Sequence, residues 1–143
     1  MHFMLALISA TVVFGFGCTA EVEPIEYGKD NCHWCQMRIM DPKFGSAVVT
    51  DKGRNYKFDS AECLLHYLTT SGQACQHTVV TNFESPGHYI ISDEAWFLVS
   101  KNMPSPMGGY LNAFATQEAA QNFQAKEGGE IYDWNGIFAV YAK

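Results

Sequence analysis

The order of predicted elements repeats once along the chain, and this repeat constrains the fold more than any other feature. Residues 44–59 contain two extended runs around Asp51-Lys52-Gly53, a pattern typical of a β-hairpin. Residues 60–72 follow with the signals of a helix. After a polar loop, residues 88–93 predict another strand. The first half therefore has the order strand, strand, helix, strand.

The helix at residues 60–72 carries signals at both ends. Asp59 or Ser60 is a suitable N-terminal cap, Glu62 is an acidic residue in the first turn, and Gly72 is a suitable end. The face of the helix that should pack on a sheet is apolar and recurs at helical spacing. Its members are Ala61, Leu64, Leu65 and Leu68.

The second half has a similar order of elements. Residues 94–116 predict a strand, a loop rich in proline and glycine, and a second strand. Residues 117–129 predict a helix that Thr116 caps and Gly128-Gly129 ends, and residues 130–142 predict an extended segment. Neither half could bury its apolar face alone. We therefore expect one α+β domain of two ββαβ-like halves, each a small antiparallel sheet with a helix.

The start of the chain is an uncharged apolar run, residues 3–17, that Cys18 follows. The run is shorter than the roughly 20 residues that a membrane-spanning helix needs, and it fits the apolar region of a secretory signal. A small residue before a cysteine is typical of a bacterial lipoprotein processing site, where Cys18 would be lipidated; the alternative is an ordinary cleaved signal. The predicted organisation is a lipoprotein signal peptide at 1–17, an acidic lipidated tether at 18–29 and a folded domain at 30–143.

The net charge and the predicted export limit the classes of function that the chain can have. The net charge is −6 and no cluster of Lys and Arg is present, so nucleic acid is not an expected partner. An exported protein meets an oxidising compartment, where thiols pair unless they are kept reduced or bind a metal. Each of the five cysteines could therefore form a disulfide, stay reduced or bind a metal.

The segment NCHWCQMRIMDP, residues 31–42, is the strongest candidate site. If Cys35 and Met37 lie in an extended segment, their side chains point to the same face, and Cys32 could fold over from the preceding turn. Thiolate and thioether ligands together favour Cu(I), whereas a structural zinc site usually has four nitrogen or sulfur ligands. His33, between the two cysteines, is the nearest nitrogen donor. The segment predicts a Cu(I) site.

Two other interpretations of the sulfurs stay open. One is a structural disulfide between Cys32 and Cys35, or from either of them to Cys63 or Cys75. The other is thiol–disulfide exchange, although its first cysteine should stand at a helix N-terminus and the residues after Cys35 are poor helix formers. Cys63 itself could face the metal or be a buried small apolar residue.

A second sulfur candidate lies in the segment NMPSPMGG, residues 102–109. Its methionines lack the spacing of core residues, and Pro104 and Pro106 stiffen the loop. Met107 could therefore reach a metal that the first segment holds. The alternative is that Met107 fills a gap under the loop, as methionine often does.

These segments resemble the NosL family, the copper-binding lipoproteins associated with nitrous oxide reductase. The resemblance rests on CHWCQMRIMDPKFGSAVVTDKGRNYKFDSAECLLHYL and on SPMGG followed by AF and an Ala-rich helix. It implies that Cys35 and Met37 form the C-x-M motif and that Met107 belongs to the Pro-Met-Gly motif, with Cys32 as an extra sulfur. It also implies the two-part ββαβ architecture, which is similar to a domain of the alkylmercury lyases.

The resemblance implies a function as well. A NosL-like protein would be a Cu(I) chaperone, not an enzyme, that a lipid anchor holds on a bacterial membrane facing the periplasm. It would deliver copper to an exported copper enzyme, namely nitrous oxide reductase. The alternatives are an exported thiol oxidoreductase that uses Cys32 and Cys35, and a disulfide-stabilised structural lipoprotein.

Overall fold

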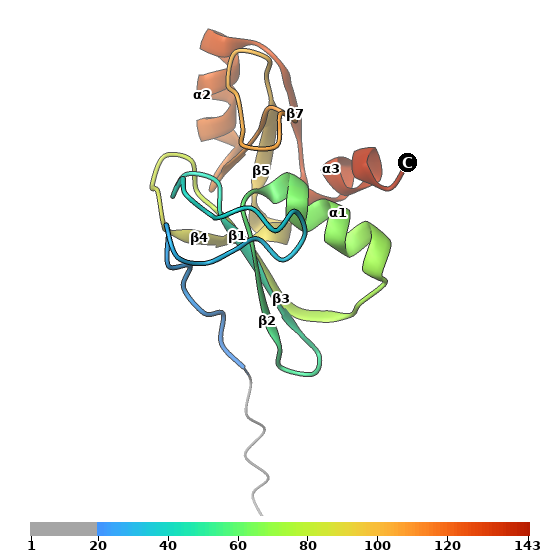
Figure 1. The fold of residues 1–143 in the computed structure, drawn as a ribbon. Coiled ribbons are helices and arrows are strands. Elements are labelled where there is room, and N and C mark those ends of the chain that lie inside the picture. Colours follow the sequence, from blue (N-terminus) through green and yellow to red (C-terminus); the bar gives the residue numbers. More distant parts are fainter. Residues whose placement is uncertain (1–19) are drawn as a thin grey trace, which may run out of the picture.

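Two small antiparallel sheets with helices packed on them form the protein (Figure 1). The computed structural model describes residues 20–143. Cys18 and the predicted signal peptide at 1–17 lie outside the described residues. Within the described part, no helix has the length and apolar character to cross a membrane.

The first sheet has the strand order β2-β1-β3-β4, all antiparallel. The helix α1 connects β2 to β3. The predicted hairpin is confirmed, with Val48 of β1 opposite Tyr56 of β2. The bounds are β1 Ser46–Thr50, β2 Asn55–Phe58, α1 Ala61–Ser71, β3 Cys75–Thr81 and β4 Tyr89–Ile91.

The strand β3 was missed by the sequence analysis, which predicted a polar loop between the helix and residues 88–93. Its first half is exposed or half-buried, and only Val79, Val80 and Thr81 are buried. The polar residues Gln76 and His77 therefore give the sequence pattern of a loop to a strand that pairs with β1 on one side and β4 on the other.

The second sheet has the order β6-β5-β7, also antiparallel. The helix α2 follows β6 as predicted, and Thr116 caps it by accepting a hydrogen bond from the Ala119 N–H at 3.1 Å. The bounds are a short 3-10 helix η1 Ser92–Glu94, β5 Trp96–Val99, β6 Leu111–Phe114, α2 Gln117–Glu127, β7 Glu130–Tyr132 and α3 Trp134–Tyr141.

The extended segment predicted at residues 130–142 is wrong after Tyr132, because residues 134–141 form the helix α3. Asp133 caps this helix, and its carboxylate accepts a hydrogen bond from the Gly136 N–H at 2.7 Å. Aromatic and β-branched residues favour strands, but here Ile137 is fully buried in the main core. Tertiary packing of one apolar face decides in favour of a helix.

Both halves contribute to one hydrophobic core, as predicted. Val48 and Val80 of the first sheet, Leu64 of α1, and Phe97 and Leu111 of the second sheet are buried in the same cluster. Full burial of a side chain of this size contributes about 1.5–3 kcal/mol. A smaller cluster lies under α2 and consists of Leu98, Met103, Phe114 and Ala120. The two halves are therefore one α+β domain.

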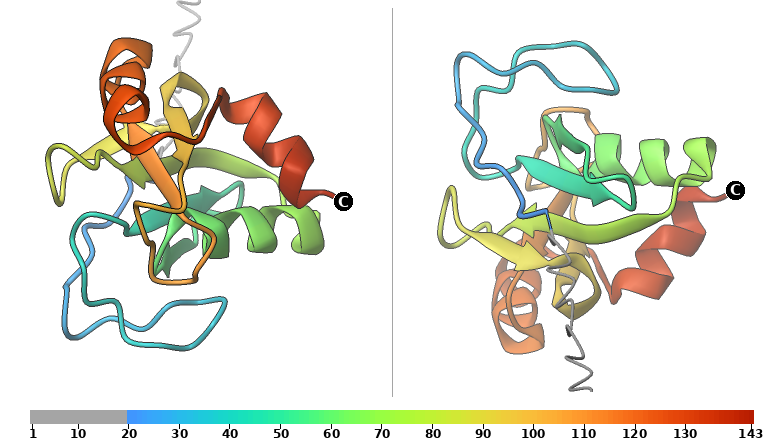
Figure 2. Two further views of the ribbon diagram at one scale, coloured as in Figure 1. Left: turned by 90° about the horizontal axis from the view of Figure 1, so that it is seen from above. Right: turned by 90° about the horizontal axis from the view of Figure 1, so that it is seen from below.

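The segment before β1 forms a wide loop that stands out from the first sheet and leads back into β1 (Figure 2). Two backbone hydrogen bonds close it, from the Gly28 N–H to the Ile39 carbonyl at 2.8 Å and from the Ile39 N–H to the Asp30 carbonyl at 2.9 Å. Ile25 is buried in the main core. Residues from Glu23 onward, which the sequence analysis placed in the tether, therefore pack against the domain.

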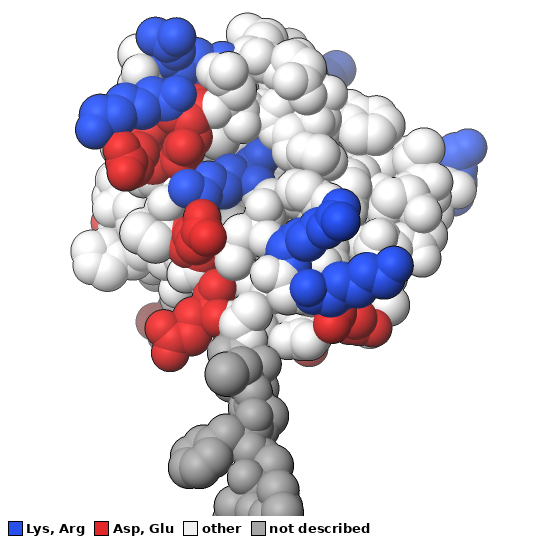
Figure 3. Space-filling view, turned by 60° about the horizontal axis from the view of Figure 1, so that its bottom comes forward, with Lys and Arg blue, Asp and Glu red and all other residues white. Residues whose placement is uncertain are grey.

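The surface around this loop carries charges of both signs. Lys57 of β2 forms ion pairs with Asp30 at 2.8 Å and with Glu23 at 3.8 Å. On the face that Figure 3 shows, basic and acidic side chains lie next to one another. The pair between Lys57 and Asp30 attaches the loop to the edge strand of the first sheet.

Candidate metal centre

Three cysteines that are distant in sequence lie together. The Sγ atoms of Cys32, Cys35 and Cys63 are all within 4.8 Å of one another. Cys32 and Cys63 are fully buried, whereas Cys35 is half-buried and reaches the surface. We call these three residues the thiol cluster. Among the His, Cys, Asp and Glu side chains of residues 20–143, it is the one group of three or more with metal-ligand spacing.

Two cysteines of the thiol cluster come from a tight loop, residues 31–38, that a β-bridge between Asn31 and Arg38 closes. The Cys32 N–H donates to the Met37 carbonyl at 2.7 Å, and the Gln36 N–H donates to the Cys32 carbonyl at 3.0 Å. Gln36 has a positive φ of 63°, which reverses the chain. The extended geometry that the sequence analysis assumed from Cys35 to Met37 is therefore wrong.

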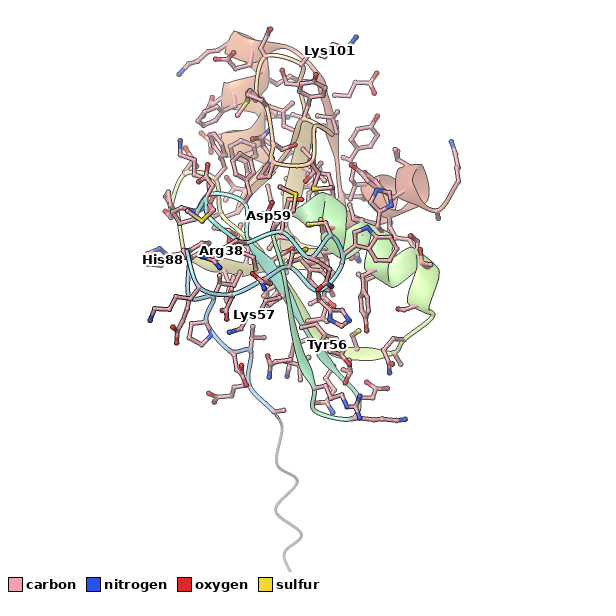
Figure 4. All side chains as sticks on the ribbon, viewed as in Figure 1. Arg38, Tyr56, Lys57, Asp59, His88 and Lys101 are labelled. Atoms are coloured by element: carbon pink, nitrogen blue, oxygen red, sulfur yellow. The ribbon has the colours of Figure 1, made fainter. Side chains whose placement is uncertain are left out.

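The third cysteine comes from the first turn of α1. Ser60 caps this helix by accepting the Cys63 N–H, and Asp59, labelled in Figure 4, lies where β2 passes into the helix. The loop 31–38 is attached to β2, because the His33 N–H donates to the Lys57 carbonyl at 2.8 Å. The His33 ring stacks on Tyr56 at 4.0 Å. The strand β2 thus positions both parts of the thiol cluster.

The pKa values of Cys32 and Cys63 in the thiol cluster are shifted in opposite directions. The neighbouring Cys63 thiol, together with backbone N–H groups that include that of Cys35 at 3.5 Å, lowers the pKa of Cys32 to about 5. The same contact and burial raise the pKa of Cys63. Burial raises the pKa of Cys35. These shifts favour deprotonation of Cys32 before that of Cys35 or Cys63.

The predicted methionine candidates lie on exposed loops. Met37 is 57% exposed and Met107 is 38% exposed. The loop of Met107 reaches α1, because the Ser105 hydroxyl donates a hydrogen bond to Glu62, the neighbour of Cys63 in sequence. The structure thus brings the Met107 loop to the first turn of α1. Met103 is buried in the core under α2 and is a packing residue.

The four described cysteines are free thiols. Cys75 lies at the start of β3 and is not a member of the thiol cluster. The structural disulfides considered from the sequence are therefore not formed among residues 20–143. His33 is also outside the cluster, although it was the nearest nitrogen donor in sequence.

The spacing of the thiol cluster fits one soft metal ion. A metal–thiolate bond of about 2.3 Å allows two sulfurs on the same ion to be up to about 4.6 Å apart, close to the observed limit. Thiolate ligands suit Cu(I), zinc and iron–sulfur clusters, but a structural zinc site has four ligands and the cluster supplies three. With thioethers on adjacent loops, the residues present fit Cu(I).

The fold and site define a two-sheet α+β protein with three thiols at metal-ligand spacing. Residues 24–141 match the family model described as NosL, and the chain belongs to the NosL family. Membership confirms the resemblance drawn from the sequence.

A solved structure has the same fold. It is described as the crystal structure of the copper chaperone NosL from Shewanella denitrificans, and it is 22% identical to this chain with a TM-score of 0.70. The match covers 82% of this chain and 95% of the other. No curated protein matches the chain.

Cys63 is the candidate ligand that the sequence analysis left open. Its signal was present in the helix pattern, because a residue three places after the cap Ser60 lies in the first turn. That position is buried at the point where β2, the loop 31–38 and α1 meet. The distance between Cys63 and Cys32 along the chain concealed their contact.

Proposed function

We propose that this protein is a Cu(I) chaperone that carries one copper ion on the thiol cluster. The observation that carries the proposal is the convergence of three free thiols within 4.8 Å. Soft sulfur ligands select Cu(I) over calcium, magnesium and manganese. The family and the copper chaperone described for the similar solved structure support the same function.

The proposed ligands combine the predicted residues with one more. Cys32, Cys35 and Cys63 supply sulfur from the thiol cluster, and Met107 and Met37 supply thioethers from exposed loops. Cys35 is the accessible thiol of the cluster, so an incoming ligand from a partner would meet it first. A partly open site of this kind allows a partner to take the ion by displacing one ligand at a time.

The destination of the copper is the finer part of the proposal. An exported copper enzyme, nitrous oxide reductase, is the recipient that the family suggests. Lipidation at Cys18 would hold the chaperone on a bacterial membrane, facing the periplasm. The test is the copper content of nitrous oxide reductase purified from cells with and without this protein; an unchanged copper content would contradict delivery to that enzyme.

Copper binding itself is tested by anaerobic titration of the reduced protein with Cu(I) in the presence of a chromophoric Cu(I) chelator. We expect one equivalent of copper to be withdrawn from the chelator, and an excess of zinc not to prevent it. Failure to withdraw copper would contradict the proposed function.

Thiol–disulfide exchange is the second candidate function, because Cys32, whose pKa is lowered, lies beside two other thiols. The loop geometry argues against it. Residues 33–35 form a turn and not the first turn of a helix, which in exchange enzymes activates the first cysteine. We expect no acceleration of insulin reduction by dithiothreitol; acceleration at the rate of an ordinary thiol oxidoreductase would favour the second candidate.

A further inference from the structure

Glu62 is a buried acidic residue that the copper site leaves unexplained. Its side chain is 2% exposed, and it occupies the second position of α1, directly before Cys63. An acidic residue in the first turn stabilises a helix by about 0.3–1 kcal/mol through its interaction with the helix dipole. This interaction does not require the residue to be buried. Burial of a carboxyl group costs free energy unless the group has partners. Its environment therefore points to a second role.

The partner of Glu62 is the loop that carries Met107. The Ser105 hydroxyl donates a hydrogen bond to Oε1 of Glu62, and the same hydroxyl oxygen accepts the Leu111 N–H at 3.2 Å. Ser105 also begins a turn, because its carbonyl accepts the Gly108 N–H at 3.0 Å. Met107 therefore stands in a turn whose first residue is attached to Glu62.

The other end of this turn also rests on Glu62. A Cβ atom at Gly109 would lie 2.9 Å from Cγ of Glu62 and 2.8 Å from the Tyr141 hydroxyl, so only a glycine allows this close approach. Ser105 and Gly109 thus contact Glu62 on either side of Met107. Oε2 of Glu62 is buried without a hydrogen-bond partner. We call the contact of Glu62 with Ser105 and Gly109 the loop anchor.

We propose that Glu62 is a positioning residue that holds Met107 beside the thiol cluster. The inference rests on the proposed Cu(I) site. Glu62 connects the thiol cluster to the loop of Met107. One peptide bond joins Glu62 to Cys63, and a hydrogen bond joins it to Ser105 in that loop. Without the loop anchor, binding copper through Met107 would require ordering the loop at that moment.

The experiment is a double-mutant cycle on Cu(I) affinity, measured by chelator competition. Ordering one flexible side chain costs the equivalent of about 3- to 10-fold in affinity, and we expect Glu62→Ala to lose this amount. Glu62→Gln keeps an oxygen acceptor for Ser105 and should stay within twofold of the wild type. The double variant Glu62→Ala with Met107→Ala should bind no more weakly than Met107→Ala alone.

A matched control separates this role from helix stability. Glu118 has the same position in the first turn of α2 but is exposed, so Glu118→Ala removes the same dipole interaction without a loop anchor. Its affinity for Cu(I) should not change. A spectroscopic readout is the methyl resonance of Met107 in protein labelled with ¹³C-methyl methionine. Cu(I) should shift it in the wild type and in Glu62→Gln, and shift it less in Glu62→Ala.

Ser105→Ala gives a second test if Glu62→Ala folds poorly, because it removes the donor and leaves the carboxyl group in place. An equal loss of affinity for Glu62→Ala with and without Met107 would overturn the proposal, as would wild-type affinity in both Glu62→Ala and Ser105→Ala. If the wild type withdraws no copper from the chelator, the proposed function fails together with this inference. If copper binds and the cysteine variants lose it while the Glu62 and Ser105 variants do not, only the inference fails.

Discussion

The buried sulfurs of Cys32 and Cys63 lie within 4.8 Å of one another, and this contact joins the loop 31–38 to the first turn of α1. The two residues are fully buried, and Cys35 completes the thiol cluster at the surface. The contact has a chemical consequence because it lowers the pKa of Cys32.

The pH dependence of stability should report the Cys32 thiolate. Its pKa is about 5 in the folded protein against an ordinary value of 9.0, so between these values the unfolded chain binds more protons. This contribution to the free energy of unfolding therefore rises with pH across that window and is lost as pH falls through about 5. The raised pKa of Cys63 acts only above its ordinary value of 9.0.

Urea denaturation of the reduced, metal-free protein at several pH values measures this effect. Cys32→Ser should show a smaller increase in the free energy of unfolding from about pH 5 to pH 8 than the wild type does. Cys75→Ser, which changes a cysteine outside the thiol cluster, should keep the wild-type slope. Parallel curves for Cys32→Ser and the wild type would contradict a low pKa at Cys32.

The methionine variants should differ from one another. Met107→Ala and Met37→Ala each remove a proposed thioether, and we expect an affinity loss of about tenfold, the lower end for changes near a metal site. Met40→Ala is the control, because Met40 is also an exposed methionine but is not a proposed ligand. Met103→Ala should lower stability instead, because Met103 is buried. Chelator competition and thermal unfolding separate the two effects.

Gly129 should tolerate no side chain. It has a φ of 104°, and a Cβ atom would lie 2.2 Å from the Val99 carbonyl oxygen of β5. We expect Gly129→Ala to lower the free energy of unfolding by about 3 kcal/mol. Gly72 ends α1 with a φ of 60° and open space around it, so Gly72→Ala should cost only about 1 kcal/mol. Equal losses in urea denaturation would show that the close approach to β5 is absent.

The proposed lipid anchor is tested outside the described residues. Labelled fatty acid should enter the wild-type protein in a bacterial host and should not enter Cys18→Ser. The variant should also leave the membrane fraction. Equal labelling of the two proteins, or release of the wild type as a soluble protein, would contradict lipidation at Cys18.

Much of the fold was predictable from local signals. The turn at Asp51-Lys52-Gly53, the caps Ser60 and Thr116 and the end of α1 at Gly72 are all where the sequence analysis placed them. Each of these signals acts within a few residues. The two halves have a similar order of predicted elements, and neither could bury its apolar face alone. Their packing into one core could therefore also be predicted.

The errors occurred where distant contacts decide the structure. Polar residues at Gln76 and His77 made β3 look like a loop, and its pairing with β1 and β4 makes it a strand. The apolar residues after Asp133 looked extended, and packing of Ile137 into the core favours α3.

In the candidate site, too, contacts between residues close in sequence were predictable and distant contacts were not. Cys32 and Cys35 were found because they are close in sequence. Cys63 could not be assigned, since only the packing of α1 against the loop 31–38 brings it within 4.8 Å of them. The left-handed conformation of Gln36 could also not be predicted from the sequence, because this conformation usually occurs at glycine.

The most direct test of the central claim compares the Cu(I) affinity of single cysteine variants by anaerobic chelator competition. Cys35→Ser is the most informative, because Cys35 is half-buried and the variant should fold normally. We expect Cys32→Ser, Cys35→Ser and Cys63→Ser each to lose more than about 100-fold in affinity, and Cys75→Ser to match the wild type. Wild-type affinity in Cys35→Ser and Cys63→Ser, or a loss confined to Cys75→Ser, would show that the thiol cluster is not the copper site.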